Sequence, residues 1–246
     1  MPEDEGPEHD FIIDPAIPIP VELPPGETGI DWDAFSWEMI LSGMIRVVAD
    51  FRGKNAQGLQ NEGPPAFETA PSFNPDWIDY YRRFVLAAKP NILQEFTEAS
   101  ILKAKNGDYA LALEITAILE GLFPYSPVVL LNRALILEDK AEALEKAGRE
   151  EEAEQENRRA HAAYDRVLAL DPPFPNGLFN GGFFFMKRQD FEKARECFTS
   201  YTYLAEEGEK KEQAEILIKE ITDQGLDDGI FREAYECIRR GDEEAG

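Results

Sequence analysis

Residues 99–113 read Ala-Ser-Ile-Leu-Lys-Ala-Lys-Asn-Gly-Asp-Tyr-Ala-Leu-Ala-Leu, and this stretch decides the fold. Small and apolar residues at helical spacing stop at Asn106-Gly107-Asp108, and a second helical pattern begins directly after them. A helix, a tight Gly-Asp turn and a second helix make an antiparallel hairpin. The sequence therefore predicts one helix over about 92–105 and its partner over 109–122.

Helical patterns separated by turn residues continue on both sides of this hairpin. Before it, Trp37, Ile40, Met44 and Val48 recur at the spacing of a buried helical stripe, and a second helix is expected before Pro90. Between these two, residues 52–73 are rich in Gly, Asn, Gln and Pro, which is typical of a loop. After the hairpin, further helices are expected over 128–146, 150–170, 176–188, 191–205, 210–222 and 229–239. No stretch alternates with period two, so we predict an all-α fold.

The hairpin pattern recurs along the chain. Gly107-Asp-Tyr-Ala-Leu-Ala corresponds to Gln189-Asp-Phe-Glu-Lys-Ala, with a turn, an Asp that can cap the next helix, an aromatic residue and an alanine. The spacings of Ala112, Thr116 and Pro124 are repeated by the series Ala160, Tyr164 and Pro172. Self-similarity of this kind indicates a repeat architecture.

The repeat resembles the tetratricopeptide repeat, a 34-residue helix-turn-helix. That family places a small residue near the middle of each first helix, a position that Ser100, Ala134 and Gly182 occupy here. Leu168-Ala-Leu-Asp-Pro172 is similar to the family's usual ending. The resemblance covers about 92–205 and implies a tetratricopeptide-like α-solenoid, a right-handed superhelical array of antiparallel helix hairpins.

The middle repeat is longer than its neighbours. Pro124 and Pro172 are 48 positions apart, which is two heptads more than the family's unit, and Gly148 divides this surplus equally between the two helices. Seven extra residues lengthen each arm by about 10 Å at the rise of an α-helix. The added tip, Lys140–Glu156, is mostly charged. It is either a solvated hairpin end or a surface for a basic partner.

Four regions are expected from these patterns. Residues 1–30 form an acidic, Pro-rich segment in an extended form, because proline fixes φ and removes a hydrogen-bond donor. Residues 31–90 supply N-terminal helices, 91–206 the repeats and 207–246 C-terminal capping helices. The apolar side chains between the prolines of Phe11–Pro24 leave three readings open: a tail packed on its own domain, a docking segment, or an occupant of the protein's own groove.

Composition limits the class of partner. A formal charge of −24 and a pI near 4.4 repel nucleic-acid phosphates and anionic lipids, and attract basic proteins. Cys197 and Cys237 are the only cysteines, which is typical of a reducing compartment. No Lys or Arg precedes Arg46, and no apolar run reaches the length of a bilayer span. We therefore expect a cytoplasmic protein that binds neither nucleic acid nor membrane.

No catalytic, cofactor or metal motif stands out. The sequence has no Gly-Lys-Ser/Thr phosphate loop, no Gly-x-Ser-x-Gly elbow and no His-Glu-x-x-His helix. Asn180-Gly-Gly-Phe183 falls inside a predicted hairpin, where close helix packing explains the glycines better than a phosphate site does. The two histidines, His9 and His161, and the two cysteines are too few and too far apart in the sequence to match the ligand spacing of a metal site. We predict that the protein is not an enzyme and needs no cofactor.

The resemblance also implies a concave groove lined by the first helix of every repeat. Mapped onto this chain, the groove residues are Thr97, Ile101, Leu131, Leu135, Glu138, Asn176, Phe179 and Phe183. An apolar, aromatic lining with charge toward one edge suits an extended peptide or a helix with apolar anchors. The predicted function is a scaffold or adaptor that binds a protein or peptide. The alternative is a closed structural subunit whose groove holds its own Pro-rich segment and whose acidic outer face binds a basic partner.

Overall fold

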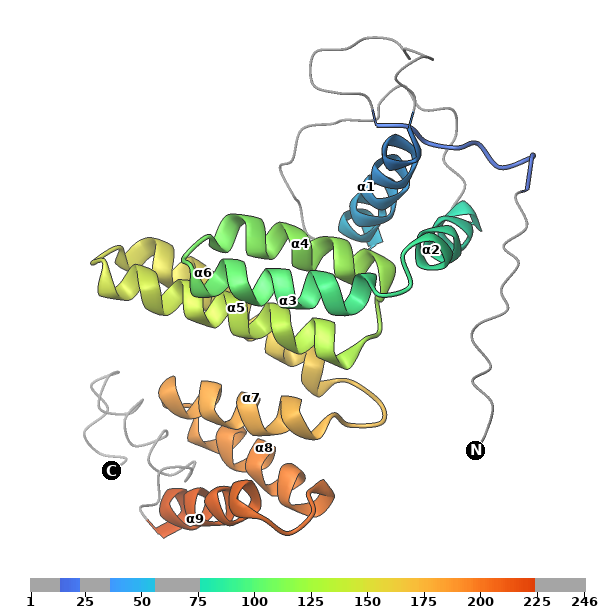
Figure 1. Cartoon of the computed structure of the whole chain (residues 1–246). Helices are drawn as coiled ribbons and strands as arrows, with labels where there is room; N and C mark the ends of the chain where they lie inside the picture. Colours follow the sequence, from blue (N-terminus) through green and yellow to red (C-terminus); the bar gives the residue numbers. More distant parts are fainter. Residues whose placement is uncertain (1–13, 23–35, 56–75, 224–246) are drawn as a thin grey trace, which may run out of the picture. The chain divides into compact units, whose positions relative to one another are not determined.

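A computed structural model describes residues 14–22, 36–55 and 76–223, and its described residues contain helices and no strand, which confirms the all-α prediction (Figure 1). The chain divides into an N-terminal unit, Met1–Asn132, and a C-terminal unit, Arg133–Gly246. The helices are α1 (Trp37–Asn55), α2 (Asp76–Ala88), α3 (Ile92–Lys105), α4 (Tyr109–Leu122), α5 (Pro127–Lys146), α6 (Glu150–Leu168), α7 (Pro175–Lys187), α8 (Phe191–Leu204) and α9 (Glu209–Asp223).

The turn at Gly107 has the geometry that its sequence predicts. Gly107 has a φ of 79°, in the left-handed region that glycine enters without steric cost. The amide of Asp108 donates to the carbonyl of Lys103 at 3.0 Å, which closes the end of α3. The Asp108 carboxylate accepts from the amide of Leu111 at 3.3 Å and so caps α4.

The same turn closes the two later hairpins. Gly148 has a φ of 71°, and the amide of Arg149 donates to the carbonyl of Leu144 at 3.0 Å. At the third turn the left-handed position is Gln189, with a φ of 61°, and Asp190 caps α8 through the amide of Lys193 at 3.2 Å. Glutamine has a Cβ and is strained in this conformation. The three hairpins therefore close with the same type of turn. In the first two the left-handed residue is glycine, and in the third it is glutamine.

The core of the N-terminal unit lies where α1, α2 and α4 meet. Met44 and Val48 of α1 and Val85 of α2 are fully buried there. Helix α4 approaches α1 closely at Gly121, where a Cβ would lie 2.8 Å from the carbonyl oxygen of Val48. A small residue is required at this crossing.

Two expectations for α1 are wrong. Trp37, placed on the buried stripe, is 62% exposed, because it is the first residue of the helix and stacks on Phe84 with only one face. The helix also continues to Asn55, so the first residues of the loop expected at 52–73 are helical. The helix expected at 229–239 and residues 1–13 of the expected Pro-rich segment lie outside the described residues.

Glycines set the packing of α7 in the C-terminal unit. A Cβ on Gly182 would lie 2.5 Å from the ring of Phe198 on α8, and one on Gly177 would lie 2.3 Å from Val167 on α6. Of the two glycines in Asn180-Gly-Gly-Phe183, Gly182 therefore serves close helix packing, as predicted, whereas a Cβ on Gly181 would make only an ordinary contact, 3.4 Å from Leu168. Helices α5 and α6 have 20 and 19 residues, against 13 and 14 in α7 and α8, so the middle hairpin is longer as expected.

Candidate functional site

The residues predicted to line a groove fall into both units of the chain. Three belong to the N-terminal unit: Thr97, Ile101 and Leu131. Five belong to the C-terminal unit: Leu135, Glu138, Asn176, Phe179 and Phe183.

In the N-terminal unit, only one of the three predicted residues is well exposed. Ile101 is 39% exposed on α3, whereas Leu131 is 8% exposed and Thr97 is partly buried. Between the two α3 residues, the hydroxyl of Ser100 donates to the carbonyl of Thr97 at 2.8 Å and accepts from Nδ2 of Asn132 at 2.7 Å. Ser100 is fully buried, and its hydroxyl links α3 to Asn132 near the start of α5.

Glu138 of α5 is buried and already partnered, although the sequence assigned it to the charged edge of the groove. Its Oε2 accepts from the hydroxyl of Tyr164 at 2.7 Å, and its Oε1 accepts from Nζ of Lys187 at 2.8 Å. Lys187 also donates to Glu142 at 2.6 Å. Both carboxylate oxygens of Glu138 therefore hold α6 and α7 in place.

The pKa shifts of this network agree with a structural role. Burial raises the pKa of Tyr164, and the neighbouring Glu138 carboxylate raises it further, so the hydroxyl stays a donor. Desolvation lowers the pKa of Lys187, but hydrogen bonds to Glu138 and Glu142 outweigh it and raise the value to about 12. Asp139 is exposed beside them, and partial burial together with Glu138 and Glu142 raises its pKa. Solvent and a partner can reach Asp139, and they can also reach part of the Glu142 side chain, which is 34% exposed.

Phe179 and Phe183 form an aromatic ladder with α8. Phe179 is 9% exposed, and its ring centroid lies 5.1 Å from that of Phe183 and 4.9 Å from that of Tyr201. Phe183 is partly buried and packs edge-on against Phe198 at 5.2 Å. These rings belong mainly to the interior of the hairpin, and Phe183, which is partly buried, is more accessible than the buried Phe179. Leu135 of α5 is likewise only partly buried.

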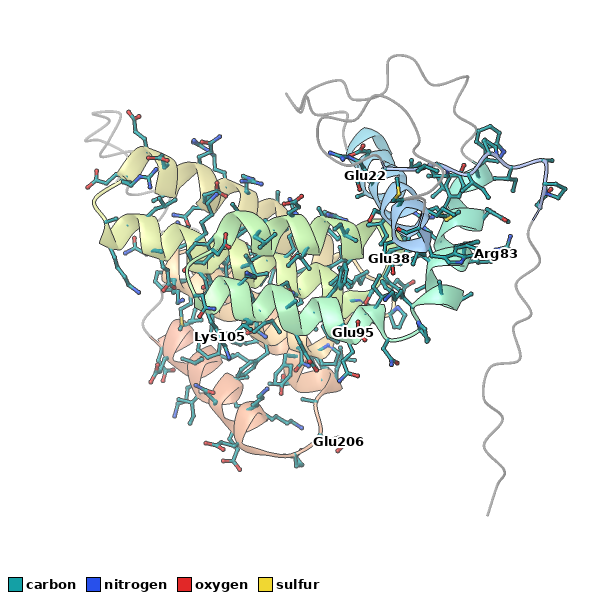
Figure 2. All side chains as sticks on the ribbon, turned by 45° about the horizontal axis from the view of Figure 1, so that its top comes forward. Glu22, Glu38, Arg83, Glu95, Lys105 and Glu206 are labelled. Carbon is teal, nitrogen blue, oxygen red and sulfur yellow. The ribbon has the colours of Figure 1, made fainter. Side chains whose placement is uncertain are left out.

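An open hollow of about 440 Å³ lies beside the ladder, where α7 begins and α8 leads into α9. Its lining combines apolar side chains with two lysines and two glutamates: Pro175, Asn176, Tyr201, Leu204, Ala205, Glu206, Gly208, Glu209, Lys210 and Lys211. Asn176 is exposed and is the predicted groove residue that reaches this hollow. Glu206 lies in the connection from α8 to α9 at its rim (Figure 2).

The hollow has an apolar wall and a rim of mixed charge, with two lysines and two glutamates. Leu204 is 47% exposed, and the Tyr201 ring on the same helix continues the ladder outward. The ammonium group of Lys210 stands 5.4 Å from the ring centroid of Phe179, a cation–π contact that places a positive charge over the aromatic ladder. Lys211 is paired with Glu207 at 2.6 Å. An apolar side chain can enter here, with a carboxylate next to Lys210.

Sequence reasoning missed the contribution of α8 and α9 to this site. The family pattern assigns the groove to the first helix of each repeat, so Tyr201, Leu204 and Lys210 were not candidates. One signal was available in the sequence: Tyr201-Thr-Tyr-Leu204 places large apolar residues directly before the Ala-Glu-Glu-Gly break at 205–208. In the structure Leu204 is 47% exposed.

Other reactive groups of the described chain are buried or dispersed. Cys197 is buried, and desolvation raises the pKa of its thiol to about 12, so it packs as a neutral side chain. Within the described residues, no group of three or more His, Cys, Asp and Glu is arranged to hold a metal ion. Nor does that part of the chain contain a helix long and apolar enough to cross a membrane.

Comparison with known proteins found no matching family model, curated protein or solved structure.

Proposed function

We propose that this chain is a non-enzymatic scaffold or adaptor that binds a protein or peptide segment on the surface of its helical hairpins. The hairpins would stack as a right-handed, tetratricopeptide-like array in the cytoplasm. The recurrence of one turn at Gly107, Gly148 and Gln189 supports this architecture, because a repeated hairpin is the unit from which such arrays are built.

The observation that carries the binding role is the hollow beside Asn176. It joins a residue predicted from the repeat to an exposed leucine and an aromatic wall. Binding energy at protein interfaces is concentrated where an anchor side chain fills a desolvated pocket. A hollow of about 440 Å³ is large enough for one aromatic or aliphatic anchor together with its flanking main chain.

Charge supports a partner that is basic outside its anchor. The net charge of −24 raises the local concentration of basic segments and speeds their encounter with the chain. Exposed Asp139 adds a carboxylate on α5 within the same unit. The partners of residues 14–22 lie on α1 and α2, so the described residues give no support to the alternative of a groove closed by the chain's own segment.

A pair of matched substitutions tests the site. Leu204→Arg places a charge in the hollow, and Ile216→Arg makes the same change at a 58% exposed residue of α9 that does not line it. Wild type and both variants are immobilised and used for affinity capture from extract of the native host, with quantitative mass spectrometry. We expect Leu204→Arg to lose proteins that wild type and Ile216→Arg both retain.

Thermal unfolding of the three proteins controls for loss of structure. Both positions are exposed, so each variant should melt within a few degrees of wild type. If all three proteins capture the same set, or none captures anything above the bare matrix, the proposed site is wrong.

A further inference from the structure

Residues 14–22, here called the strap, run along α1 and α2 and are held largely through main-chain atoms. The hydroxyl of Tyr81 donates to the carbonyl of Pro18 at 2.6 Å, and the amide of Asp14 donates to the hydroxyl of Tyr80 at 3.2 Å. At the other end, the amide of Glu22 donates to the carbonyl of Met39 at 3.0 Å. Residues 14–17 form a turn, in which the amide of Ile17 donates to the carbonyl of Asp14 at 3.2 Å and the amide of Ala16 donates to Oδ1 of Asp14 at 2.9 Å. Residues 18–22 follow without a turn, and the contacts at both ends recognise the backbone more than particular side chains.

Gly43 of α1 makes room for the strap. A Cβ at this position would lie 2.5 Å from the carbonyl oxygen of Pro20 and 2.9 Å from the amide nitrogen of Val21, closer than real Cβ atoms come. Glycine is one of the poorest helix formers, and Gly43 lies inside a 19-residue helix. Its place there is explained by the backbone that passes directly over it.

Two aliphatic anchors and the prolines give the strap its pattern. Ile17 and Val21 pack against the core of the N-terminal unit, whereas Ile19 between them is 42% exposed. Prolines at 15, 18 and 20 favour an extended chain with little entropy to lose on binding. Grooves lined with aromatic side chains recognise proline-rich segments in this way, and the buried rings of Tyr80 and Tyr81 line this one.

The strap is attached as a bound peptide is, by a few contacts along a formed surface. None of residues 14–22 is buried, whereas Tyr80 and Tyr81, which bond to them, are. An exposed ion pair between Glu22 and Arg46 fixes one end; Glu22 is labelled beside α1 in Figure 2. Segments with few buried contacts open without unfolding the rest of a domain.

We propose that the α1–α2 surface is a recognition site for peptides in which a turn leads into an extended, proline-interrupted run, with two aliphatic anchors four residues apart, and that the strap occupies it in cis. The strap therefore blocks the site, and releasing it opens the site to a peptide of the same pattern. This site consists of other residues than the hollow at α8 and α9, so a failure of the proposed function would not contradict it, and the reverse also holds.

The test uses the full-length chain and a labelled peptide with the strap sequence, Asp-Pro-Ala-Ile-Pro-Ile-Pro-Val-Glu. Ile17→Asp with Val21→Asp unhooks the strap without shortening the chain. Fluorescence anisotropy should show that this unhooked variant binds the peptide at least tenfold more tightly than wild type, whose site is occupied. A peptide carrying the same two Asp substitutions should bind neither protein.

Substitutions in the groove locate the site. In the unhooked background, Gly43→Ala should abolish peptide binding while circular dichroism shows equal or greater helix content, and Ser42→Ala should leave binding unchanged. Tyr81→Phe should weaken binding several-fold, because it removes the donor to the Pro18 carbonyl. Equal peptide affinity in wild type and unhooked chain, or undiminished binding by Gly43→Ala, would overturn the proposal.

Hydrogen exchange on the unmodified protein gives a test that needs no variant. The amide of Glu22 should exchange at least a hundredfold faster than that of Val48 in the core of α1, because the strap opens locally. Equal protection of the two amides would mean that the strap leaves only when the unit unfolds, and the proposal would then be wrong.

Discussion

The hairpins α5–α6 and α7–α8 close with the same type of turn, but different side chains fill the space between their helices. Glycine and aromatic rings fill α7–α8, where Phe198 lies against Gly182 and between Phe179 and Phe183. Helices α5 and α6 are joined by polar pairs: Lys140 with Glu156 at 2.8 Å, Asn157 with Glu145 at 2.9 Å, and Tyr164 with Glu138 at 2.7 Å.

The two hairpins have a similar backbone but are stabilised in different ways: α7–α8 by close-packed rings, and α5–α6 by hydrogen bonds between polar side chains. Close-packed rings depend on shape, so a change of volume should be costly and largely independent of pH and salt. Buried hydrogen bonds to a carboxylate depend on each partner being present and in the right protonation state. We expect α7–α8 to respond most to truncation, and α5–α6 to the removal of single polar atoms.

The largest effect is expected from Phe198→Ala. Phe198 is fully buried, and its removal leaves a cavity beside Gly182, so the free energy of unfolding should fall by about 3–5 kcal/mol. Urea unfolding followed by circular dichroism measures this. Tyr203→Ala on the same helix, 84% exposed, is the control and should change stability by no more than about 0.5 kcal/mol. A loss below about 1 kcal/mol in Phe198→Ala would contradict the close packing of this hairpin.

The hairpin turns could be predicted from the sequence because their causes are local. Gly107-Asp108 and Gln189-Asp190 each carry the left-handed residue and the capping carboxylate within two positions. The hairpin ends were therefore correct to within a residue or two.

The surface roles of single residues could not be predicted in the same way, because distant partners decide them. Glu138 is covered by Tyr164 and Lys187, which lie 26 and 49 positions away. Phe179 is covered by Tyr201 from α8 and by Lys210 from α9. Side chains that a repeat pattern places on one face can therefore be buried by helices that the pattern does not consider.

Tyr164→Phe should have the next largest effect. It removes one hydroxyl and leaves Oε2 of the buried Glu138 without that donor, so stability should fall by about 1–3 kcal/mol. Tyr125→Phe, at an 84% exposed tyrosine, should not change stability measurably. Equal stability of Tyr164→Phe and wild type in urea would show that the hydrogen bond from Tyr164 to Glu138 contributes nothing to the free energy of unfolding.

Gln189→Gly tests whether the turn of α7–α8 has the same conformational requirement as the glycine turn of α5–α6. A residue with a Cβ is strained at a φ of 61°, so glycine should raise the free energy of unfolding by about 0.5–1 kcal/mol. Gly148→Ala, at a φ of 71° with open space around it, should lower it by a similar amount. Thermal unfolding of both variants should shift in opposite directions; a shift in the same direction would contradict a common turn.

The smallest effect is expected from Lys187→Met, and it should depend on pH. Hydrogen bonding to Lys187 lowers the pKa of Glu142 below its ordinary 4.5. The ionised Glu142 carboxylate therefore contributes to stability above pH 4.5, and this contribution is lost as the pH falls through the lowered pKa. The pKa of Lys187 is raised from 10.5 to about 12, so its own contribution is present below 10.5 and is lost as the pH rises through about 12.

Because the Lys187 side chain is 54% exposed, the stability difference between wild type and Lys187→Met should stay below about 1 kcal/mol. It should be larger at pH 7 than at pH 3.5 in urea titrations. Lys219→Met, on exposed α9, should show no such dependence. A difference that grows as the pH falls would have the wrong sign for this network.

Hydrogen–deuterium exchange of the full chain with and without a purified captured partner tests the binding role most directly. If the hollow takes an anchor from the partner, amides of residues 176–180 and 201–211 should gain protection in the complex, and Leu204→Arg should abolish the gain. Protection confined to other helices, with no change at residues 201–211, would contradict the assignment of the site to α8 and α9.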